Sequence, residues 1–101
     1  MDDDRPDVLL TGLLFYDLVL TGLGKPPTPG EEIWTGGMGC GPGGIANLAG
    51  AAARFGLRTS LAAVFGDDFY GEYCRDVLCD QEGIDLSLSR TADGWPTPVT
   101  V

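Results

Sequence analysis

A glycine-rich segment at residues 36–44 runs directly into a stretch that favours an α-helix. Six of its nine residues are glycine, and the chain of 101 residues holds 16 glycines, roughly twice the usual share of ~7%. Apolar residues then recur at the spacing of one helix face, as Ile45, Leu48, Ala49 and Ala52. The alanine-rich composition predicts a slim helix, able to pack closely on a sheet, that ends at Gly56.

Extended segments flank this predicted helix on both sides. The apolar run at residues 7–20 is too continuous for a strand with one exposed face, and it predicts a buried strand that bends near Gly12 and continues. Residues 21–30 are rich in Gly and Pro and form a connector. Residues 31–35 are predicted to form a short exposed strand, and residues 59–65 the next buried strand.

The second half of the chain continues the alternation of helix and strand. Asp67 or Asp68 can cap a second helix that stops at Gly83. Residues 84–88 alternate apolar and polar like a half-exposed strand, and residues 97–101 begin one more. This order predicts an α/β fold in which right-handed crossovers join parallel strands, and the length allows one core.

Composition excludes several functional classes. Six Lys and Arg against 15 Asp and Glu give a net charge of −9, so the chain lacks the basic surface that nucleic acids require. The sequence has no histidine, which removes any histidine-based triad or metal site within it. No export or membrane segment is expected, and three cysteines without framework spacing predict a cytoplasmic protein.

Residues 39–44 spell Gly-x-Gly-x-x-Gly, which by itself suggests a dinucleotide-binding loop. Such a loop should directly follow the first buried strand, whereas about twenty residues of connector and polar segment intervene here. Pro42 also removes one of the backbone amides that the loop would offer. A dinucleotide-binding oxidoreductase domain is therefore an alternative that depends on whether this loop leaves a core strand directly.

The same segment resembles the first signature of the ribokinase-like (PfkB) carbohydrate kinases. Residues 43–49 give the glycine pair, Asn47 and the small residue that follows it, and Gly56 and Gly66 fall at the expected later positions. Ile45 departs from the family pattern, which prefers Gly, Ala or Pro there. The resemblance extends back to a strand that ends near Asp17 and forward to the turn at residues 66–71, and so spans nearly the whole chain.

The resemblance implies that Asp17, Gly43, Gly44 and Asn47 bind the sugar. A carboxylate accepts two adjacent hydroxyls, glycines let backbone amides approach sugar oxygens, and an Asn amide both donates and accepts. Plain structural roles are the alternatives: Asp17 can cap a strand end, Asn47 can cap the glycine turn, and the two glycines can serve close packing.

The family's phosphoryl transfer needs parts that residues 1–101 do not contain. A downstream Gly-Ala-Gly-Asp segment supplies the anion-binding amides and the general base, and ATP and Mg²⁺ are the expected cofactors. We therefore expect residues 1–101 to be the amino-terminal segment of a kinase domain that carries much of the substrate site and is inactive alone. A non-catalytic ligand-binding or assembly module is the remaining alternative.

The resemblance also implies a small β-sheet that covers the sugar. Its strands are expected near residues 31–35 and 84–101, with Trp34 and Trp95 on or under them. Such sheets often pair between subunits, which implies a homodimer as a further expectation. Cys40 has no histidine or basic neighbour in the sequence that would lower its pKa, and it is interpreted as incidental.

Overall fold

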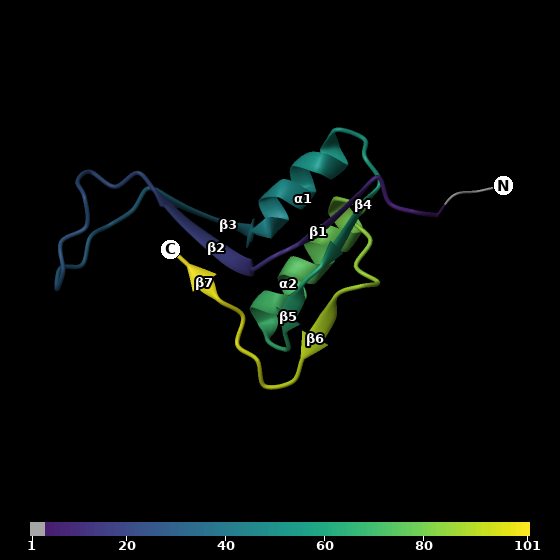
Figure 1. Ribbon diagram of the computed structural model, residues 1–101. Helices are drawn as coiled ribbons and strands as arrows, with labels where there is room; N and C mark the ends of the chain where they lie inside the picture. Colours follow the sequence, from purple (N-terminus) through teal and green to yellow (C-terminus); the bar gives the residue numbers. More distant parts are fainter. Residues whose placement is uncertain (1–3) are drawn as a thin grey trace.

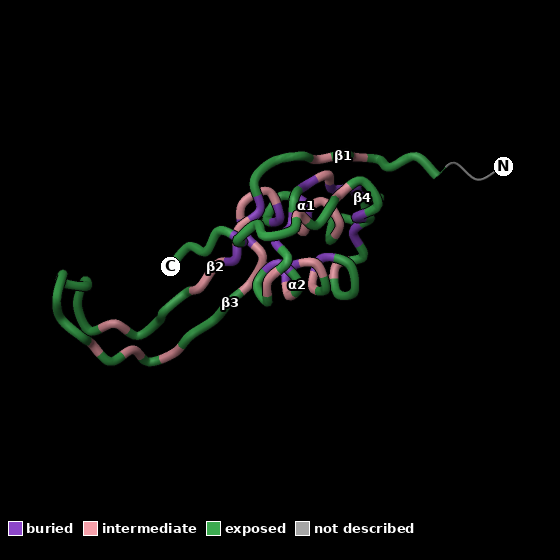
Figure 2. The backbone as a smooth tube through the Cα atoms, turned by 90° about the horizontal axis from the view of Figure 1, so that it is seen from below, coloured by how far each residue is buried: buried purple, intermediate pink, exposed green. Residues whose placement is uncertain are grey.

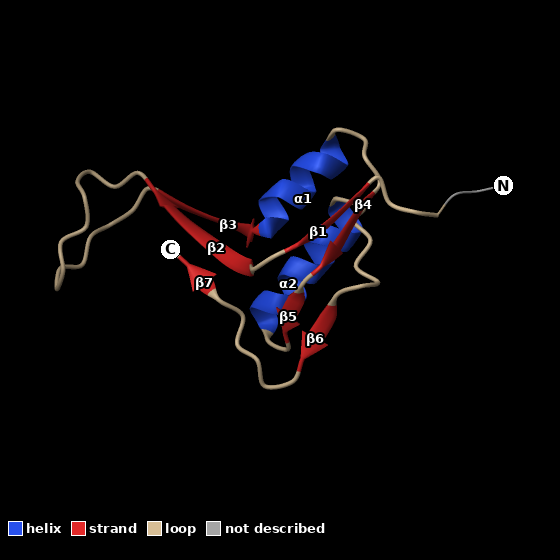
Figure 3. Cartoon of the chain, viewed as in Figure 1, coloured by secondary structure: helices blue, strands red, loops and turns tan. Residues whose placement is uncertain are grey.

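The computed structural model describes residues 4–101 as a layered body from which a long arm projects (Figure 1). Its elements in chain order are β1 (Val8–Thr11), β2 (Leu14–Thr21), β3 (Gly37–Gly44), α1 (Ile45–Arg54), β4 (Thr59–Ala62), β5 (Val64–Gly66), α2 (Phe69–Asp76), the π-helical turn η1 (Val77–Gln81), β6 (Arg90–Ala92) and β7 (Val99–Thr100). Figure 3 shows the same elements by type. The expected α/β class is confirmed.

Short parallel strands form the body. β1 pairs with β4 from Val8↔Thr59 to Thr11↔Ala62, and β5 pairs with β6 in the same sense. A single parallel bridge joins Ser60 to Asp85 on the other side of β4. Helix α1 packs against β1 and β4, and α2 packs against β5, as expected for crossovers between parallel strands.

The core lies between these strands and helices. Phe65, Leu61 and Cys74 are fully buried, and Leu78 and Ile84 nearly so. Figure 2 shows that buried residues gather in the body, whereas the far part of the arm is exposed.

The arm is an antiparallel hairpin of β2 and β3 with the connecting loop at residues 22–36. Its pairing is continuous from Leu14↔Gly44 to Thr21↔Gly37. β7 adds to the other edge of β2 in parallel, which makes a three-stranded sheet in the order β3-β2-β7. The molecule is elongated, with a longest dimension of 60 Å.

Aromatic packing fixes the base of the arm to the body. The ring of Tyr16 in β2 is buried, with its centroid 4.8 Å from the ring of Tyr70 and 5.5 Å from that of Tyr73, both on α2. Tilted and edge-on contacts at such distances are favourable beyond the area they bury. The sheet of the arm therefore has one face on α2 and one face that points away from it.

The glycine-rich segment is a strand, where the sequence predicted a loop. Residues 37–44 pair along their whole length with β2, whereas residues 31–35, predicted to be a strand, form none. Glycine disfavours strands because it has no side chain to pack, but here every residue of the segment is paired with a residue of β2. Pairing with a distant apolar strand outweighs the local preference.

Other expected strands are shorter than predicted. The segment at 59–65 breaks into β4 and β5 at Ala63, whose N–H donates to Ser89 Oγ at 3.0 Å. Of the segment at 84–88, only Asp85 forms a bridge, because its carboxylate accepts a hydrogen bond from Ser87 N at 2.8 Å and turns the chain. The segment at 97–101 contains β7.

The predicted helix boundaries are confirmed. α1 ends at Arg54, and Gly56 follows with φ +90° in the left-handed region. Asp68, one of the two predicted caps, accepts a hydrogen bond from Gly71 N at 2.9 Å at the start of α2. Gly83 follows the second helical segment with φ +68°.

Candidate substrate site

Asp17 lies in the middle of β2, between the two other strands of the arm. Its neighbours across the sheet are Gly41 on β3 and Thr100 on β7. Alternation along β2 places Asp17 on the face opposite Tyr16, and therefore on the face that points away from α2. Because Asp17 is inside a strand, it does not cap a strand end.

The carboxylate of Asp17 lies directly on the backbone of Gly43. A Cβ at residue 43 would be 2.1 Å from Asp17 Oδ2 and 2.4 Å from Oδ1, far inside van der Waals contact. On the other side, the hydroxyl of Thr100 donates a hydrogen bond to Asp17 Oδ1. Gly43 and Thr100 together therefore hold the carboxylate in place.

Gly44 makes the turn from the arm into α1. Its φ is +64°, and a Cβ there would be 2.3 Å from the carbonyl oxygen of Leu13. The next residue, Ile45, donates its N–H to that same carbonyl at 2.9 Å. The Ile45 side chain fits because residue 12 is glycine, where a Cβ would be 3.0 Å from Ile45 Cβ. The departure from the family pattern at residue 45 is thereby accommodated.

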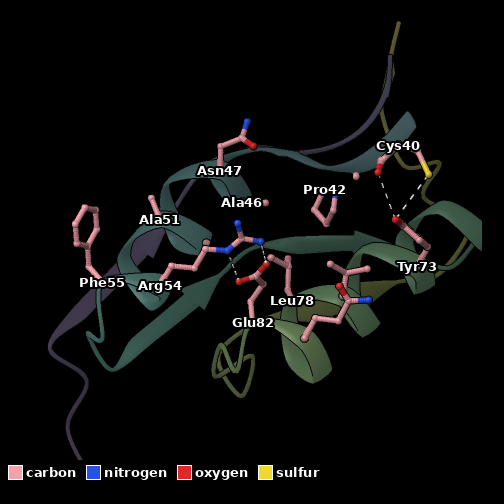
Figure 4. Close-up of a pocket in the computed structure, with 14 residues that line it drawn as sticks. Cys40, Pro42, Ala46, Asn47, Ala51, Arg54, Phe55, Tyr73, Leu78 and Glu82 are labelled. Carbon is pink, nitrogen blue, oxygen red and sulfur yellow. Dashed lines mark hydrogen bonds and ion pairs between the residues drawn. The ribbon is translucent and has the colours of Figure 1, made fainter. Parts of the chain in front are cut away.

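Asn47 is exposed in the first turn of α1, one turn beyond the glycine pair. It lines a cavity of about 570 Å³ between α1 and the α2–η1 segment, together with Gly41 and Pro42 of β3. Asp17 is not among the residues that line this cavity. In Figure 4 the Asn47 amide points away from the Arg54–Glu82 pair. The structure thus brings Asp17 and Gly43 into contact but shows no contact between Asp17 and Asn47.

An ion pair joins the two helical segments across this cavity. Arg54 Nε of α1 donates to Glu82 Oε2 at 3.0 Å, and Arg54 Nη2 contacts Glu82 Oε1 as well. These hydrogen bonds lower the pKa of the Glu82 carboxyl and raise that of Arg54. These contacts link the last residue of α1 to the residue that follows η1.

Cys40 has partners that the sequence did not reveal. Its thiol lies 3.7 Å from the hydroxyl of Tyr73, which in turn donates to the carbonyl oxygen of Cys40 at 3.5 Å. Hydrogen bonds from Tyr16 and then Tyr73 lower the pKa of the Cys40 thiol. By contrast, burial raises the pKa of Cys74 to about 11. The interpretation of Cys40 as incidental overlooked phenol hydroxyls that come from other elements.

Sequence reasoning also missed two residues on the Asp17 face. The sequence predicts Thr100 only as part of a strand at residues 97–101, because its hydrogen bond with Asp17 joins positions 83 residues apart. Phe15 was assigned to a buried run, yet it pairs with Gly43, lies on the same face as Asp17 and is partly exposed. Because the residues around Phe15 are almost all apolar, the sequence does not show which of them point to the packed face of the strand and which to the exposed face.

The structure of the arm excludes the alternative that residues 39–44 form a dinucleotide-binding loop. Residues 39–44 belong to a strand that returns from the projecting arm and pairs antiparallel with β2, so they are not a loop that leaves the first core strand. Among residues 4–101, no cluster of three or more Cys, Asp or Glu side chains could hold a metal ion. Neither helix in that range has the length and apolar character needed to span a membrane.

Residues 5–101 match the pfkB family carbohydrate kinases, and the chain belongs to this family. It is 37% identical over 95 residues to a nucleoside kinase of Methanothermobacter thermautotrophicus, a match that covers 92% of this chain and 30% of that protein. The chain therefore spans less than a third of the length of this relative.

Solved ribokinases share the fold. The ribokinase of Arabidopsis thaliana, complexed with ribose and ATP, matches with a TM-score of 0.76 and 25% identity over 93% of this chain and 30% of that one. The ribokinase of Cryptococcus neoformans var. grubii, in complex with ADP, matches with a TM-score of 0.65 and 28% identity over 90% of this chain and 28% of that one. The expected ribokinase-like fold is confirmed.

Proposed function

We propose that the complete protein transfers a phosphoryl group from ATP to a hydroxyl of a sugar or nucleoside, and that residues 1–101 form the amino-terminal segment with much of the alcohol-binding site. Membership of the carbohydrate kinase family and the similarity to a nucleoside kinase and to ribokinases support this proposal.

The contact of Asp17 with Gly43 carries the proposal for the site. The hydroxyl of Thr100 engages Oδ1 of the carboxylate, and we propose that Oδ2 accepts a hydrogen bond from an alcohol. Hydrogen bonds to an ionised acceptor are about twice as strong as neutral ones, so a fixed carboxylate is suited to binding vicinal hydroxyls. Gly43 and Gly44 leave room for a ligand to approach the backbone, and we propose that Asn47 contacts the same alcohol.

This segment binds and orients the alcohol, and the remaining steps belong to the rest of the kinase. The general base and the nucleotide-binding amides are expected in a later Gly-Ala-Gly-Asp segment, which residues 1–101 lack. We propose that ATP with Mg²⁺ is held there as well, as the family resemblance implies. The chain of 101 residues is accordingly proposed to be inactive alone.

The arm is proposed to cover the bound alcohol. Its lid strands are β2, β3 and β7, in place of the segment at 31–35. Trp34 and Met38, 97% and 70% exposed near the far end, would suit contact with a second copy, so a homodimer through the arm is part of the proposal. We further propose that the protein is cytoplasmic and has neither nucleic acid nor membrane partners.

A kinase assay on the complete protein tests the proposed function. Phosphorylation of one or more members of a panel of pentoses, hexoses and nucleosides with ATP is expected, together with a fall in kcat/KM of roughly 10- to 100-fold in an Asp17→Ala variant. Turnover by the isolated 101-residue chain would contradict the placement of the base elsewhere. Absence of turnover by the complete protein on every alcohol would favour a non-catalytic ligand-binding module.

A further inference from the structure

An aromatic ring stands next to the carboxylate on the candidate substrate face. Phe15 and Asp17 are two residues apart on β2, so they share one face with Cα atoms about 7 Å apart. The ring of Phe15 also reaches the glycine turn, because a Cβ at Gly44 would lie 2.7 Å from Phe15 Cδ2. Phe15, Asp17 and the glycine pair therefore form one continuous surface.

The partial exposure of Phe15 follows the alternation of the two faces along β2. Its neighbours Leu14 and Tyr16 point to the opposite face and are only 4% and 8% exposed. Phe15 stays partly exposed because its cross-strand neighbour is Gly43, which has no side chain to cover the ring. A partly exposed aromatic ring beside a fixed carboxylate is suited to a ligand that is polar on one side and flat and apolar on the other.

The charges around this surface favour an uncharged ligand. Asp17 is acidic, the chain carries a net charge of −9, and the basic side chain that lines the neighbouring cavity, Arg54, is engaged by Glu82. A phosphorylated sugar would need free basic groups here. A neutral alcohol with an apolar ring fits the surface better.

We infer that Phe15 determines substrate specificity by providing the apolar wall on which a nucleobase stacks, so that the site accepts a nucleoside in preference to a free pentose. The inference rests on the proposed function, because it takes Asp17 to bind the ribose hydroxyls. A nucleoside presents a vicinal diol and a flat base on adjacent parts of one molecule, which matches the carboxylate and the ring on adjacent positions of one strand face. A free pentose has the diol but no base to cover the ring.

Steady-state kinetics of the complete kinase, with nucleosides and free ribose as alternative substrates, test the inference. Phe15→Ala should lower kcat/KM for a nucleoside by roughly 5- to 100-fold, the range expected when a base loses an aromatic stacking partner. The same variant should change kcat/KM for ribose by less than about threefold, and Phe15→Tyr should retain the nucleoside activity because it keeps the ring. Phe69→Ala is the matched control, since this phenylalanine is 70% exposed at the start of α2 and does not line the cavity that Asn47 lines.

The outcomes separate this inference from the proposed function. An equal loss for both substrates in Phe15→Ala, or a wild-type enzyme that prefers ribose, would overturn the role of Phe15 while the kinase function stands. A wild-type enzyme without turnover of any alcohol would overturn the proposed function, and the inference would fall with it. Urea unfolding of each variant checks that a loss of activity is not a loss of folded protein.

Discussion

The carboxylate of Asp17 fills the space that a side chain at Gly43 would occupy. A Cβ at residue 43 would be 2.1 Å from Oδ2 and 2.3 Å from Cγ of Asp17. Glycine at residue 43 is therefore required by the position of the carboxylate. This relationship links a residue of β2 to the glycine signature of the family and permits direct tests.

Gly43→Ala should displace the Asp17 carboxylate and impair the complete kinase. The short Asp17 side chain must rotate away from the new Cβ, which removes its alignment towards the alcohol. We expect kcat/KM to fall by roughly 10- to 100-fold, the cost of a lost hydrogen bond to a charged group. Gly39→Ala, on the same strand with no atom within 4 Å of the new Cβ, is the control. Equal kinetics of the two variants would contradict this account.

Thr100→Val should weaken substrate binding through Asp17 alone. The substitution removes the hydroxyl that donates to Asp17 Oδ1 and keeps the shape of the side chain. The loss of one orienting hydrogen bond predicts a fall in kcat/KM of about 3- to 10-fold, smaller than that of Asp17→Ala. In the Asp17→Ala background, Thr100→Val should have no further effect, and additive losses in the double variant would show that Thr100 acts elsewhere.

Asp68→Ala should destabilise the fold and reduce its sensitivity to acid. Asp68 accepts hydrogen bonds from Gly71 N at 2.9 Å, Thr97 N at 2.9 Å and Thr97 Oγ1 at 2.6 Å, and so joins the start of α2 to the segment before β7. Loss of the cap alone costs about 1 kcal/mol. The Thr97 hydroxyl lowers the pKa of Asp68, and the folded state therefore favours the ionised carboxylate.

The sign of the pH dependence follows from this shift. The contribution of Asp68 is complete above its ordinary pKa of 3.8 and is lost as the pH falls through the lower value of the folded state. Urea unfolding between pH 2 and pH 7 should therefore show that the difference in free energy of unfolding between wild type and Asp68→Ala becomes smaller at low pH. Asp76→Ala, at an exposed carboxylate without a cap hydrogen bond, is the control. A difference in free energy of unfolding that does not depend on pH would contradict the role of the ionised Asp68 carboxylate.

The cysteines should differ in their reaction with iodoacetamide. At pH 7.5 the exposed Cys40, with its pKa lowered by Tyr16 and Tyr73, should be alkylated well before the buried Cys74, whose pKa is about 11. Tyr73→Phe removes the hydroxyl that lies 3.7 Å from the Cys40 thiol and lowers the pKa of that thiol, so the substitution should slow its alkylation. Peptide mass spectrometry follows each site, and denaturation in urea should equalise the rates. Equal labelling of Cys40 and Cys74 in the folded protein would refute this difference.

Local features of the sequence predicted the helices, and their ends in particular. The apolar spacing before Gly56 and the cap at Asp68 depend on neighbours within a few residues, so they could be predicted without the fold. The strand at residues 37–44 could not, because its stability comes from pairing with β2 across a long connector.

Only part of the candidate site could likewise be predicted from the sequence. The family resemblance pointed to Asp17, Gly43, Gly44 and Asn47, and the structure joins the first two by direct contact. Thr100 was missed because its role depends on a parallel register between distant strands. The roles of the four residues in binding an alcohol stay predictions until a substrate is tested.

Hydroxyl deletion combined with Asp17→Ala tests the central proposal most directly. The measurement is kcat/KM of the complete kinase for its best substrate and for the analogue that lacks one of the two vicinal hydroxyls, each with wild type and with the variant. If the carboxylate binds that hydroxyl, its deletion should cost roughly 10- to 100-fold in the wild type and almost nothing in Asp17→Ala. An equal cost in both proteins would show that Asp17 does not bind the substrate hydroxyls.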